Sequence, residues 1–290
     1  MTRTQGQNMR GKTVLVTGAS SGIGLATAQE LARRGAAVLV HARDEARGQA
    51  AVAQIRRSSA NPLVSLVLAD LRSPAEVRRL ARDVRAQVER LDVLINNAAI
   101  IPAKRELTPD GIEVQFAVNH LAPFMLTNEL LPLLKASGAG RIVNVSSEAH
   151  RDGVVNLDDL ENARQYDRPG FPVAGWQAYS NTKLMNVLFT YELARRLGGT
   201  GVTANALHPG VIGTGLTRTL PGPLRAVYGL VMPRPATGAR TSVALASDPA
   251  LGGRSGEYFN EKAQAVPSSD ASHDEALARE LWSRSEAYAR

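Results

Sequence analysis

The chain has 290 residues, 44% of them hydrophobic, and its 34 Lys and Arg against 27 Asp and Glu give a formal net charge of +7. This composition excludes a disordered or fibrous protein and is ample for one large α/β domain. The absence of cysteine excludes disulfides, thiolate catalysis and cysteine-based zinc sites, and it favours a cytoplasmic protein.

The placement of apolar and basic residues gives three further expectations. No apolar run is long enough to cross a bilayer, and residues 1–10 lack the hydrophobic segment of a signal peptide. We therefore expect a flexible tail there and no integral membrane segment. Basic residues are scattered among acidic ones, as in residues 76–90, so we expect no nucleic-acid partner. The excess charge favours an anionic ligand such as a phosphorylated cofactor.

Short apolar runs alternate along the chain with amphipathic stretches. The predicted strands are residues 13–17, 37–40, 65–69, 92–96, 141–145, 202–207 and, from a weaker pattern, 256–260. The predicted helices include residues 24–34, 75–90, 111–134 and 178–197. Repeated strand–helix–strand order requires right-handed crossovers. We therefore expect residues 11–290 to form a single α/β domain, a doubly wound parallel sheet of about seven strands with helices on both faces (Rossmann type).

Ligands of such a fold bind outside the carboxyl ends of the strands. Glycines and short polar residues gather at these strand ends in the sequence. They are GASSGIG after the first strand, HARD after the second, Asp70 after the third, Asn96-Asn97-Ala98 after the fourth, Ser146-Ser147 after the fifth and His208-Pro209-Gly210 after the sixth. This common edge is the predicted binding site.

The loop TGASSGIG, residues 17–24, joins the first strand to the first helix. Gly18 permits a tight turn, Gly22 lets the backbone approach a ligand, and Gly24 allows close helix–strand packing. The helix start then offers free N–H groups and a positive dipole end to a pyrophosphate. The spacing differs from G-x-G-x-x-G, and the alternative is a plain structural turn. The other expected contacts in this loop are Ser20, Ser21 and Ile23.

The end of the second strand, VLVHARDE, bears on which dinucleotide binds. Arg43 offers a planar charged fork suited to a 2′-phosphate, whereas Ala42 leaves no carboxylate at the strand end for ribose hydroxyls. The alternative roles for Asp44 are a ribose partner and a helix cap. We favour NADP(H) over NAD(H).

Tyr179 and Lys183 lie at i and i+4 of the helix predicted at residues 178–197, so their side chains share one side of it. An ordinary core tyrosine and a solvated lysine are the alternative interpretation. This chain strongly prefers arginine, however, and a lysine one turn after a tyrosine beside the predicted binding edge favours a chemical role.

Five motifs in this order resemble those of the short-chain dehydrogenase/reductase family. They are TGASSGIG, NNAA (residues 96–99), NVSS (144–147), YSNTK (179–183) and HPG (208–210). The resemblance covers about residues 11–260, and the stretches VNHLAPFMLT, SSEAHR, NLDDL and ALHPGVIGTGL are similar to the retinol-dehydrogenase-like branch. It implies an NADP(H)-dependent oxidoreductase that interconverts a small-molecule carbonyl, an aldehyde or ketone, and an alcohol by hydride transfer.

The resemblance also implies a catalytic tetrad. Tyr179 would exchange a proton with the carbonyl oxygen, and Lys183 would lower the tyrosine pKa, about 10 when unperturbed, by stabilising the phenolate. Lys183 would also hold the nicotinamide ribose. Ser147, rather than Ser146, would bind the substrate oxygen. Asn119 would hold a water that links the lysine to solvent.

Further cofactor contacts follow from the same resemblance. Asp70 and Leu71 would meet the adenine, and Asn97 and Ala98 would lie along the cofactor. The contacts implied near the nicotinamide are Pro209, Gly210, Val211 and Thr214. No spacing of histidines and carboxylates suggests a metal, and the chemistry needs none.

Two stretches are expected to shape substrate choice. Residues 150–178 form a long insertion between the proposed serine and tyrosine. Residues of about 213–238 are apolar between prolines and glycines, which is typical of a mobile lid and predicts a lipophilic substrate. The alternatives are a short helix packed on the core and a surface that touches a membrane. The resemblance implies pairing through residues 111–134 and 178–197, as a homodimer or homotetramer.

Two other functions stay open at this point. One is an NADPH-binding sensor or scaffold without turnover, since a fold does not itself imply chemistry. The intact Ser147, Tyr179 and Lys183 argue against it. The other is a reductase of carbon–carbon double bonds. The absence of cysteine argues against that one, because the relatives that do this chemistry employ a cysteine.

Overall fold

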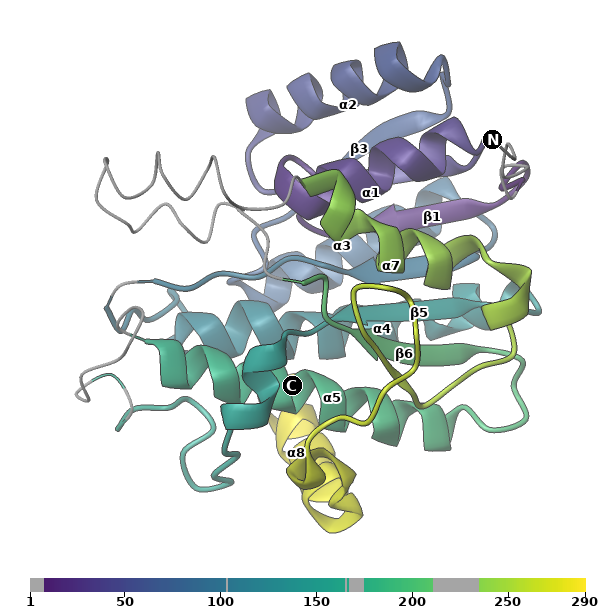
Figure 1. The fold of residues 1–290 in the computed structure, drawn as a ribbon. Coiled ribbons are helices and arrows are strands. Elements are labelled where there is room, and N and C mark those ends of the chain that lie inside the picture. Colours follow the sequence, from purple (N-terminus) through teal and green to yellow (C-terminus); the bar gives the residue numbers. More distant parts are fainter. Residues whose placement is uncertain (1–7, 103, 165, 167–174, 211–234) are drawn as a thin grey trace.

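The computed structural model describes residues 8–102, 104–164, 166, 175–210 and 235–290. Over this part of the chain seven strands form one parallel sheet in the order β3-β2-β1-β4-β5-β6-β7 (Figure 1). The strands are β1 (Thr13–Val16), β2 (Ala37–Ala42), β3 (Val64–Leu68), β4 (Val93–Asn96), β5 (Arg141–Val145), β6 (Thr203–Leu207) and β7 (Tyr258–Phe259). The predicted doubly wound parallel sheet is confirmed.

Helices cover both faces of this sheet. They are α1 (Gly22–Arg33), α2 (Glu45–Ser59), α3 (Pro74–Gln87), α4 (Ala122–Ala136), α5 (Trp176–Arg196), α7 (Pro235–Ser247) and α8 (Glu275–Tyr288). Shorter helical turns are η1 (Phe116–Leu121), η2 (Glu148–Asp152), η4 (Pro249–Leu251) and η5 (Asp270–His273).

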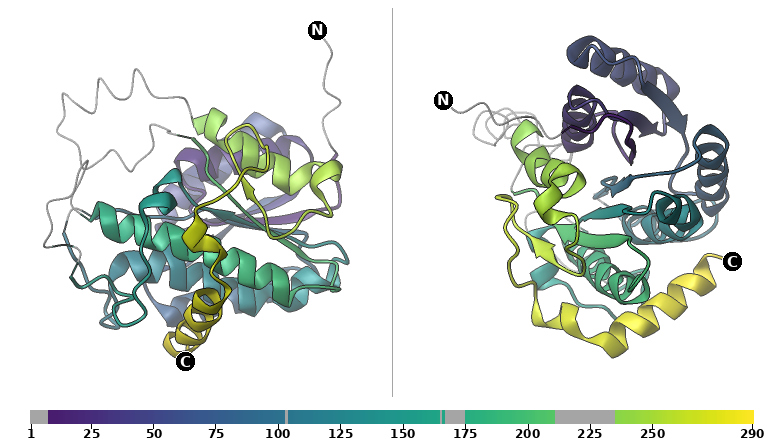
Figure 2. Two further views of the ribbon diagram at one scale, coloured as in Figure 1. Left: turned by 60° about the horizontal axis from the view of Figure 1, so that its bottom comes forward. Right: turned by 90° about the vertical axis from the view of Figure 1, so that its right-hand side faces the viewer.

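Strand β1 illustrates how the sequence covers both faces. Leu15 packs in the core cluster that includes residues of α3, α4, α5 and α8, whereas Val14 and Val16 pack in the cluster with α1, α2 and α7. Successive side chains of a strand point to opposite faces. A strand that is apolar at every position therefore needs helices on both sides, which Figure 2 shows.

The helix predicted at residues 111–134 begins later in the structure. Gly111 has φ +78°, and Leu107 pairs with Glu113 across a short antiparallel bridge. Helical structure starts at Val114 and passes at Phe116 into the π-type turn η1, which carries Asn119 and continues into α4. The sequence periodicity extended over the bridge because Ile112 and Val114 are buried there too.

Helix α8 lies against α5 at one end of the molecule (Figure 2). The Trp282 ring is 4.9 Å from the Phe124 ring of α4 and 5.7 Å from the Phe189 ring of α5, centroid to centroid. The Arg196 guanidinium sits 4.1 Å above Trp282. Helix α8 thus covers the seam between α4 and α5, so a partner subunit on that seam, as predicted, would have to pack against α8.

Three further expectations concern the N-terminal tail, the lid and a membrane segment. Met9, placed in the expected tail, is buried, and its N–H donates to the Arg34 carbonyl at 2.9 Å. The predicted lid lies outside the described residues up to 234, and residues 235–238 form the first turn of α7. Among the described helices, none combines the length and hydropathy of a membrane span.

Candidate active site

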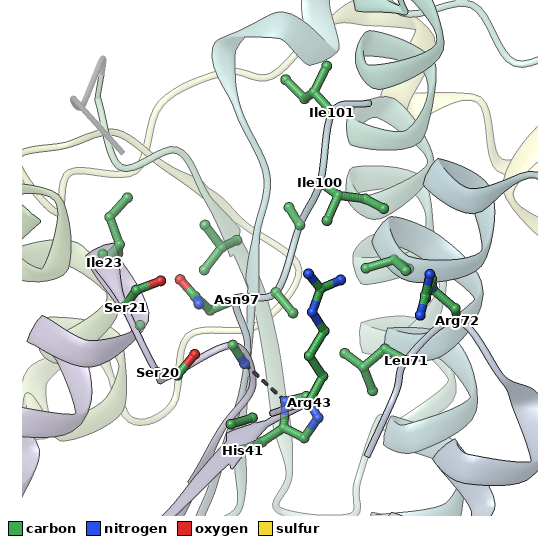
Figure 3. A pocket seen from close by; sticks show the side chains of 18 of the residues that line it. Ser20, Ser21, Ile23, His41, Arg43, Leu71, Arg72, Asn97, Ile100 and Ile101 are labelled. Carbon is green, nitrogen blue, oxygen red and sulfur yellow. Dashed lines mark hydrogen bonds between the residues drawn. The ribbon is translucent and has the colours of Figure 1, made fainter. Parts of the chain in front are cut away.

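A cavity of about 480 Å³ opens along the carboxyl edge of the sheet. Figure 3 shows part of its wall, with residues from the glycine turn, β2, and the segments after β3 and β4. The predicted site residues that line it are Gly18, Ser20, Ser21, Gly22, Ile23, Gly24, Arg43, Asp70, Leu71, Asn97, Ala98, Tyr179, Lys183 and Pro209. Residues spread over most of the sequence are therefore brought to one surface.

The glycine turn has the geometry that its sequence predicts. Gly18 and Gly22 have φ of +65° and +59°, in the left-handed region that favours glycine. A Cβ on Gly24 would lie 2.5 Å from Asn97 Nδ2 and 2.6 Å from the Gly18 carbonyl oxygen, so no larger residue fits there. Ser21 does not cap α1 with its side chain. The N–H groups of the first turn thus remain available for an anion.

His41 holds this turn to the neighbouring strands, a role that the sequence did not predict. Its Nδ1 accepts the Gly18 N–H at 3.1 Å, which leaves Nε2–H to donate to the Ala69 carbonyl at 3.1 Å. Its own carbonyl accepts the Ala19 N–H at 2.9 Å. Burial lowers the pKa of His41 to about 4. The ring is therefore neutral near pH 7 and keeps this pattern of one acceptor and one donor.

The wall of the cavity beyond β2 and β3 is rich in charge. The Arg43 side chain extends into the cavity, with Leu71 and Arg72 nearby on the wall (Figure 3). Arg72 donates to both carboxylate oxygens of Asp70 at 2.5 to 3.1 Å, and this pairing lowers the pKa of Asp70. Asp70 lines the cavity as predicted, but its carboxylate is already paired. Asp44 caps α2 by accepting the Arg47 N–H at 2.8 Å.

Tyr179 and Lys183 project from α5 into the other part of the cavity, and both are buried. Lys183 Nζ lies 5.4 Å from the centre of the Tyr179 ring and donates to the Val145 carbonyl at 2.8 Å. Ser146 Oγ donates to the Lys183 carbonyl at 2.8 Å. Ser147 Oγ accepts the Ala149 N–H at 3.2 Å. Ser146 lines the cavity and Ser147 does not, but Ser147 is the serine whose side chain lowers the pKa of the Tyr179 phenol.

The ionisation of this pair differs from the sequence prediction. Burial raises the pKa of Tyr179 to about 12, and Ser147 only partly opposes this shift. Burial also lowers the pKa of Lys183 to about 7. The predicted lowering of the tyrosine pKa is therefore wrong for this structure, because burial removes the phenol from water.

Asn119 takes a structural place beside the site. Its side-chain oxygen accepts the Ile100 N–H at 2.9 Å, and its nitrogen donates to the Ile100 carbonyl at 3.0 Å and to Thr182 Oγ1 at 3.2 Å. These bonds tie the cavity wall around Ile100 to η1 and α5. The hydrogen bonds of Lys183 and Asn119 do not join the two residues directly, so the predicted water link stays a prediction.

Of the four contacts predicted near the nicotinamide, two lie in the described part of the chain and two lie outside it. Pro209 lines the cavity, while Gly210, which does not, has φ +83° and donates its N–H to His208 Nδ1 at 3.2 Å. Val211 and Thr214 lie outside the described residues. Besides His41 and Asp44, the cavity residues that were not predicted as site residues are Ala42, Arg47, Ala69, Arg72, Ala99, Ile100, Ile101, Pro102, Glu106, Val118, Val145 and Ser146. Half of these twelve are next to a predicted site residue in the sequence, which is the signal that would have found them.

The parallel sheet, the glycine turn and the cavity beside it define the Rossmann class of nucleotide-binding folds. The family model for short chain dehydrogenases matches residues 12–158. The chain is 45% identical over 300 residues to retinol dehydrogenase 14 of Homo sapiens, covering 96% of this chain and 86% of that protein. It is 43% identical over 287 residues to human retinol dehydrogenase 13, covering 95% and 83%.

Solved structures agree with this assignment. An uncharacterized protein from Mycobacterium paratuberculosis aligns with a TM-score of 0.77 and 36% identity over 98% of this chain and 96% of that one. The RhlG/NADP active-site complex of Pseudomonas aeruginosa aligns with a TM-score of 0.71 and 27% identity over 89% and 97%. This chain belongs to the short-chain dehydrogenase family. It is an NAD(P)-dependent oxidoreductase that acts on alcohol and carbonyl groups, and within the family it is similar to the retinol dehydrogenases.

Proposed function

We propose that this enzyme uses NADP(H) to interconvert a lipophilic aldehyde or ketone and the corresponding alcohol. The observation that carries the proposal is the convergence of two groups of residues on one cavity. Tyr179 and Lys183 line it together with Arg43 and the glycine turn, and Ser147 acts on the Tyr179 phenol from beside it. A proton donor, a cation and an anion-binding turn thus share one space.

The residues present fit a nicotinamide dinucleotide. The uncapped start of α1 and the side-chain-free surface of Gly18, Gly22 and Gly24 suit a pyrophosphate. The segment of Asn97 and Ala98 would lie along the cofactor, and Lys183 would hold the nicotinamide ribose. When bound, the cofactor supplies or accepts the hydride.

Tyr179 is the proposed proton donor. With a pKa of about 12 the phenol is protonated at neutral pH, which suits transfer of a proton to a carbonyl oxygen as that oxygen gains negative charge. A charged Lys183 beside the ring would stabilise the phenolate that results. Ser147 would donate to the same carbonyl oxygen. Asn119 completes the proposed tetrad by fixing the wall at Ile100.

The preference for NADP(H) rests on charge at the adenosine end. Arg43 offers a guanidinium to a 2′-phosphate. The nearby carboxylate of Asp70 would repel such a phosphate, but its pairing with Arg72 offsets that repulsion. The Pseudomonas aeruginosa relative, solved as an NADP complex, is a precedent within the fold.

The lipophilic substrate is supported by two observations. Ile100, Ile101 and Pro102 give the cavity an apolar wall next to Val118. The two human relatives described above are named as retinol dehydrogenases, and retinol is a lipophilic alcohol. Retinaldehyde is therefore the first substrate to test.

The proposal is tested by NADPH and NADH oxidation with a panel of carbonyl compounds. The purified enzyme should oxidise NADPH with retinaldehyde and long-chain aldehydes, and NADH at least about tenfold less efficiently, since a charge-assisted contact to the 2′-phosphate contributes roughly 1.5–3 kcal/mol. NADPH binding without turnover of any carbonyl would instead identify a sensor or scaffold. Turnover of enones alone would identify a reductase of carbon–carbon double bonds.

A further inference from the structure

Glu113 is a fully buried carboxylate that the proposed chemistry does not use. It ends the short antiparallel bridge with Leu107, just after the cavity residue Glu106. Its Oε1 accepts the Gln115 N–H at 2.8 Å and the Tyr166 hydroxyl at 2.6 Å, and its Oε2 accepts the Phe116 N–H at 2.7 Å. These three donors offset the cost of burying the charge and start η1 at Phe116.

The network continues from this carboxylate to the start of α5. Gln115 Nε2 donates to the Tyr166 hydroxyl oxygen at 2.6 Å and to the Gly175 carbonyl at 3.1 Å. The same Gly175 carbonyl accepts the Tyr179 N–H at 2.9 Å. Gln115 and the proposed proton donor therefore share one acceptor.

The space around Gly175 is closed. This residue precedes α5 with φ +78°. A Cβ there would lie 2.9 Å from Tyr166 Cε1, 3.0 Å from the Pro102 carbonyl oxygen and 3.1 Å from Gln115 Nε2. Pro102 lines the cavity. Gly175, the N-cap residue of α5, is thus held between the cavity wall and the side chains of Tyr166 and Gln115.

A second carboxylate ties this network to the end of the chain. Glu161 Oε2 accepts the Glu113 N–H at 2.8 Å, and Glu161 Oε1 accepts the Tyr288 hydroxyl of α8 at 2.9 Å. The charged and titratable groups around Glu113 are Tyr166, Glu161 and Arg105. Burial raises the pKa of the Glu113 carboxyl, and its hydrogen bonds oppose that shift.

We propose that Glu113, Gln115 and Tyr166 are positioning residues that fix the start of α5 and thereby the place of the Tyr179 hydroxyl. Buried polar networks contribute little net stability, but they select one geometry over its neighbours. Displacement of a catalytic group by about 1 Å can cost about 100-fold in rate. This inference rests on the proposed role of Tyr179.

The test compares a conservative change in the network with the same change at a tyrosine of α5 outside the network. Tyr166→Phe removes the hydroxyl that bridges Glu113 and Gln115 and should lower kcat for a lipophilic aldehyde about tenfold. The Kd for NADPH should stay within about twofold of wild type. Tyr191→Phe is the matched control, because its hydroxyl bonds Ser268 Oγ at 2.7 Å and neither residue lines the cavity. It should leave kcat unchanged.

A kcat for Tyr166→Phe no lower than that of Tyr191→Phe would overturn the inference. So would a loss of NADPH affinity in proportion to the loss of kcat, because that would indicate general loosening of the fold. Gln115→Leu, a second variant, should likewise lower kcat and spare NADPH binding. If Tyr179→Phe is inactive while both network variants behave as wild type, only this inference fails; if Tyr179→Phe stays active, the proposed function fails first.

Discussion

The two ends of the cavity are built by different means. At the glycine end the main chain sets the geometry: Gly18, Gly22 and Gly24 lie within seven residues, and a side chain on Gly24 would collide with its neighbours. At the α5 end, side chains from separate segments meet around Gly175, as Glu113, Gln115 and Tyr166 do. The glycine turn has no room for a larger side chain, whereas the geometry at the start of α5 depends on hydrogen bonds between side chains. Substitutions at the two ends should therefore affect different steps.

The largest effect is expected at Lys183. Lys183→Met should lower kcat by about 10³-fold, within the range that general acid–base groups contribute. It should also raise stability at neutral pH. The pKa of the lysine falls from 10.5 to about 7 on burial, so the unfolded chain binds more protons between these values. The cost of burying the ammonium is complete below about pH 7 and disappears toward about pH 10.5.

Thermal unfolding of wild type and Lys183→Met across this pH range checks the prediction. The variant should melt at the higher temperature at about pH 7, and the gap should close toward about pH 10 as wild type gains stability. The lost hydrogen bond to Val145 narrows the gap by about 1–3 kcal/mol at every pH. A gap that does not change with pH would contradict the buried, deprotonating lysine.

At the glycine end, Gly24→Val should act on binding. The added side chain would collide with Asn97 and with the Gly18 carbonyl. Overpacking strain is about 1–3 kcal/mol, and a loss of that size from the nucleotide complex would lower NADPH affinity about 5- to 160-fold. Gly253→Ala is the control, because no atom lies within 4 Å of a Cβ at that position. Equal affinities of the two variants in a fluorescence titration would remove the glycine turn from the nucleotide site.

A smaller and more selective effect is expected from the arginines of the cavity. Arg43→Ala should reduce the preference for NADPH over NADH about tenfold or more, because a charge-assisted contact is lost.

Arg72→Leu should weaken NADPH binding about tenfold and leave NADH binding unchanged, since it frees the Asp70 carboxylate. Arg82, exposed on α3, provides the control variant Arg82→Ala. Titration of each variant with NADPH and with NADH measures both affinities. Equal losses of affinity for the two nucleotides would refute a role of these arginines in binding the 2′-phosphate.

The smallest effect on turnover is expected far from both ends. Trp282→Ala removes the ring that packs between Phe124 and Phe189 and should destabilise the fold by about 3–5 kcal/mol. At a temperature where the variant is folded, kcat should match wild type. A large loss of kcat in the folded variant would mean that α8 acts on the site directly. Denaturant unfolding and kinetics on the same sample give both values.

The parts of the molecule that the sequence predicted are those encoded by residues close together in the chain. The glycine turn lies within residues 17–24, and Tyr179 and Lys183 are one helical turn apart. The strands were predicted within two residues at each end, because most of them coincide with short apolar runs. Local spacing alone specifies these features.

The parts that the sequence did not predict depend on contacts between distant residues. His41 bonds Gly18 and Ala69, and Glu113 bonds Tyr166 fifty-three residues away. The direction of the Tyr179 pKa shift also depends on burial, which a spacing of four residues does not specify. Such contacts become visible only once the sheet has brought the strand ends together.

The central claim is that the Tyr179 hydroxyl transfers the proton in carbonyl reduction. Its most direct test is the steady-state rate and NADPH affinity of Tyr179→Phe beside wild type, with retinaldehyde as substrate. We predict that kcat falls by about 10³-fold while the Kd for NADPH changes by less than about twofold. A Tyr179→Phe enzyme that still reduces the aldehyde at a rate near that of wild type would contradict the account.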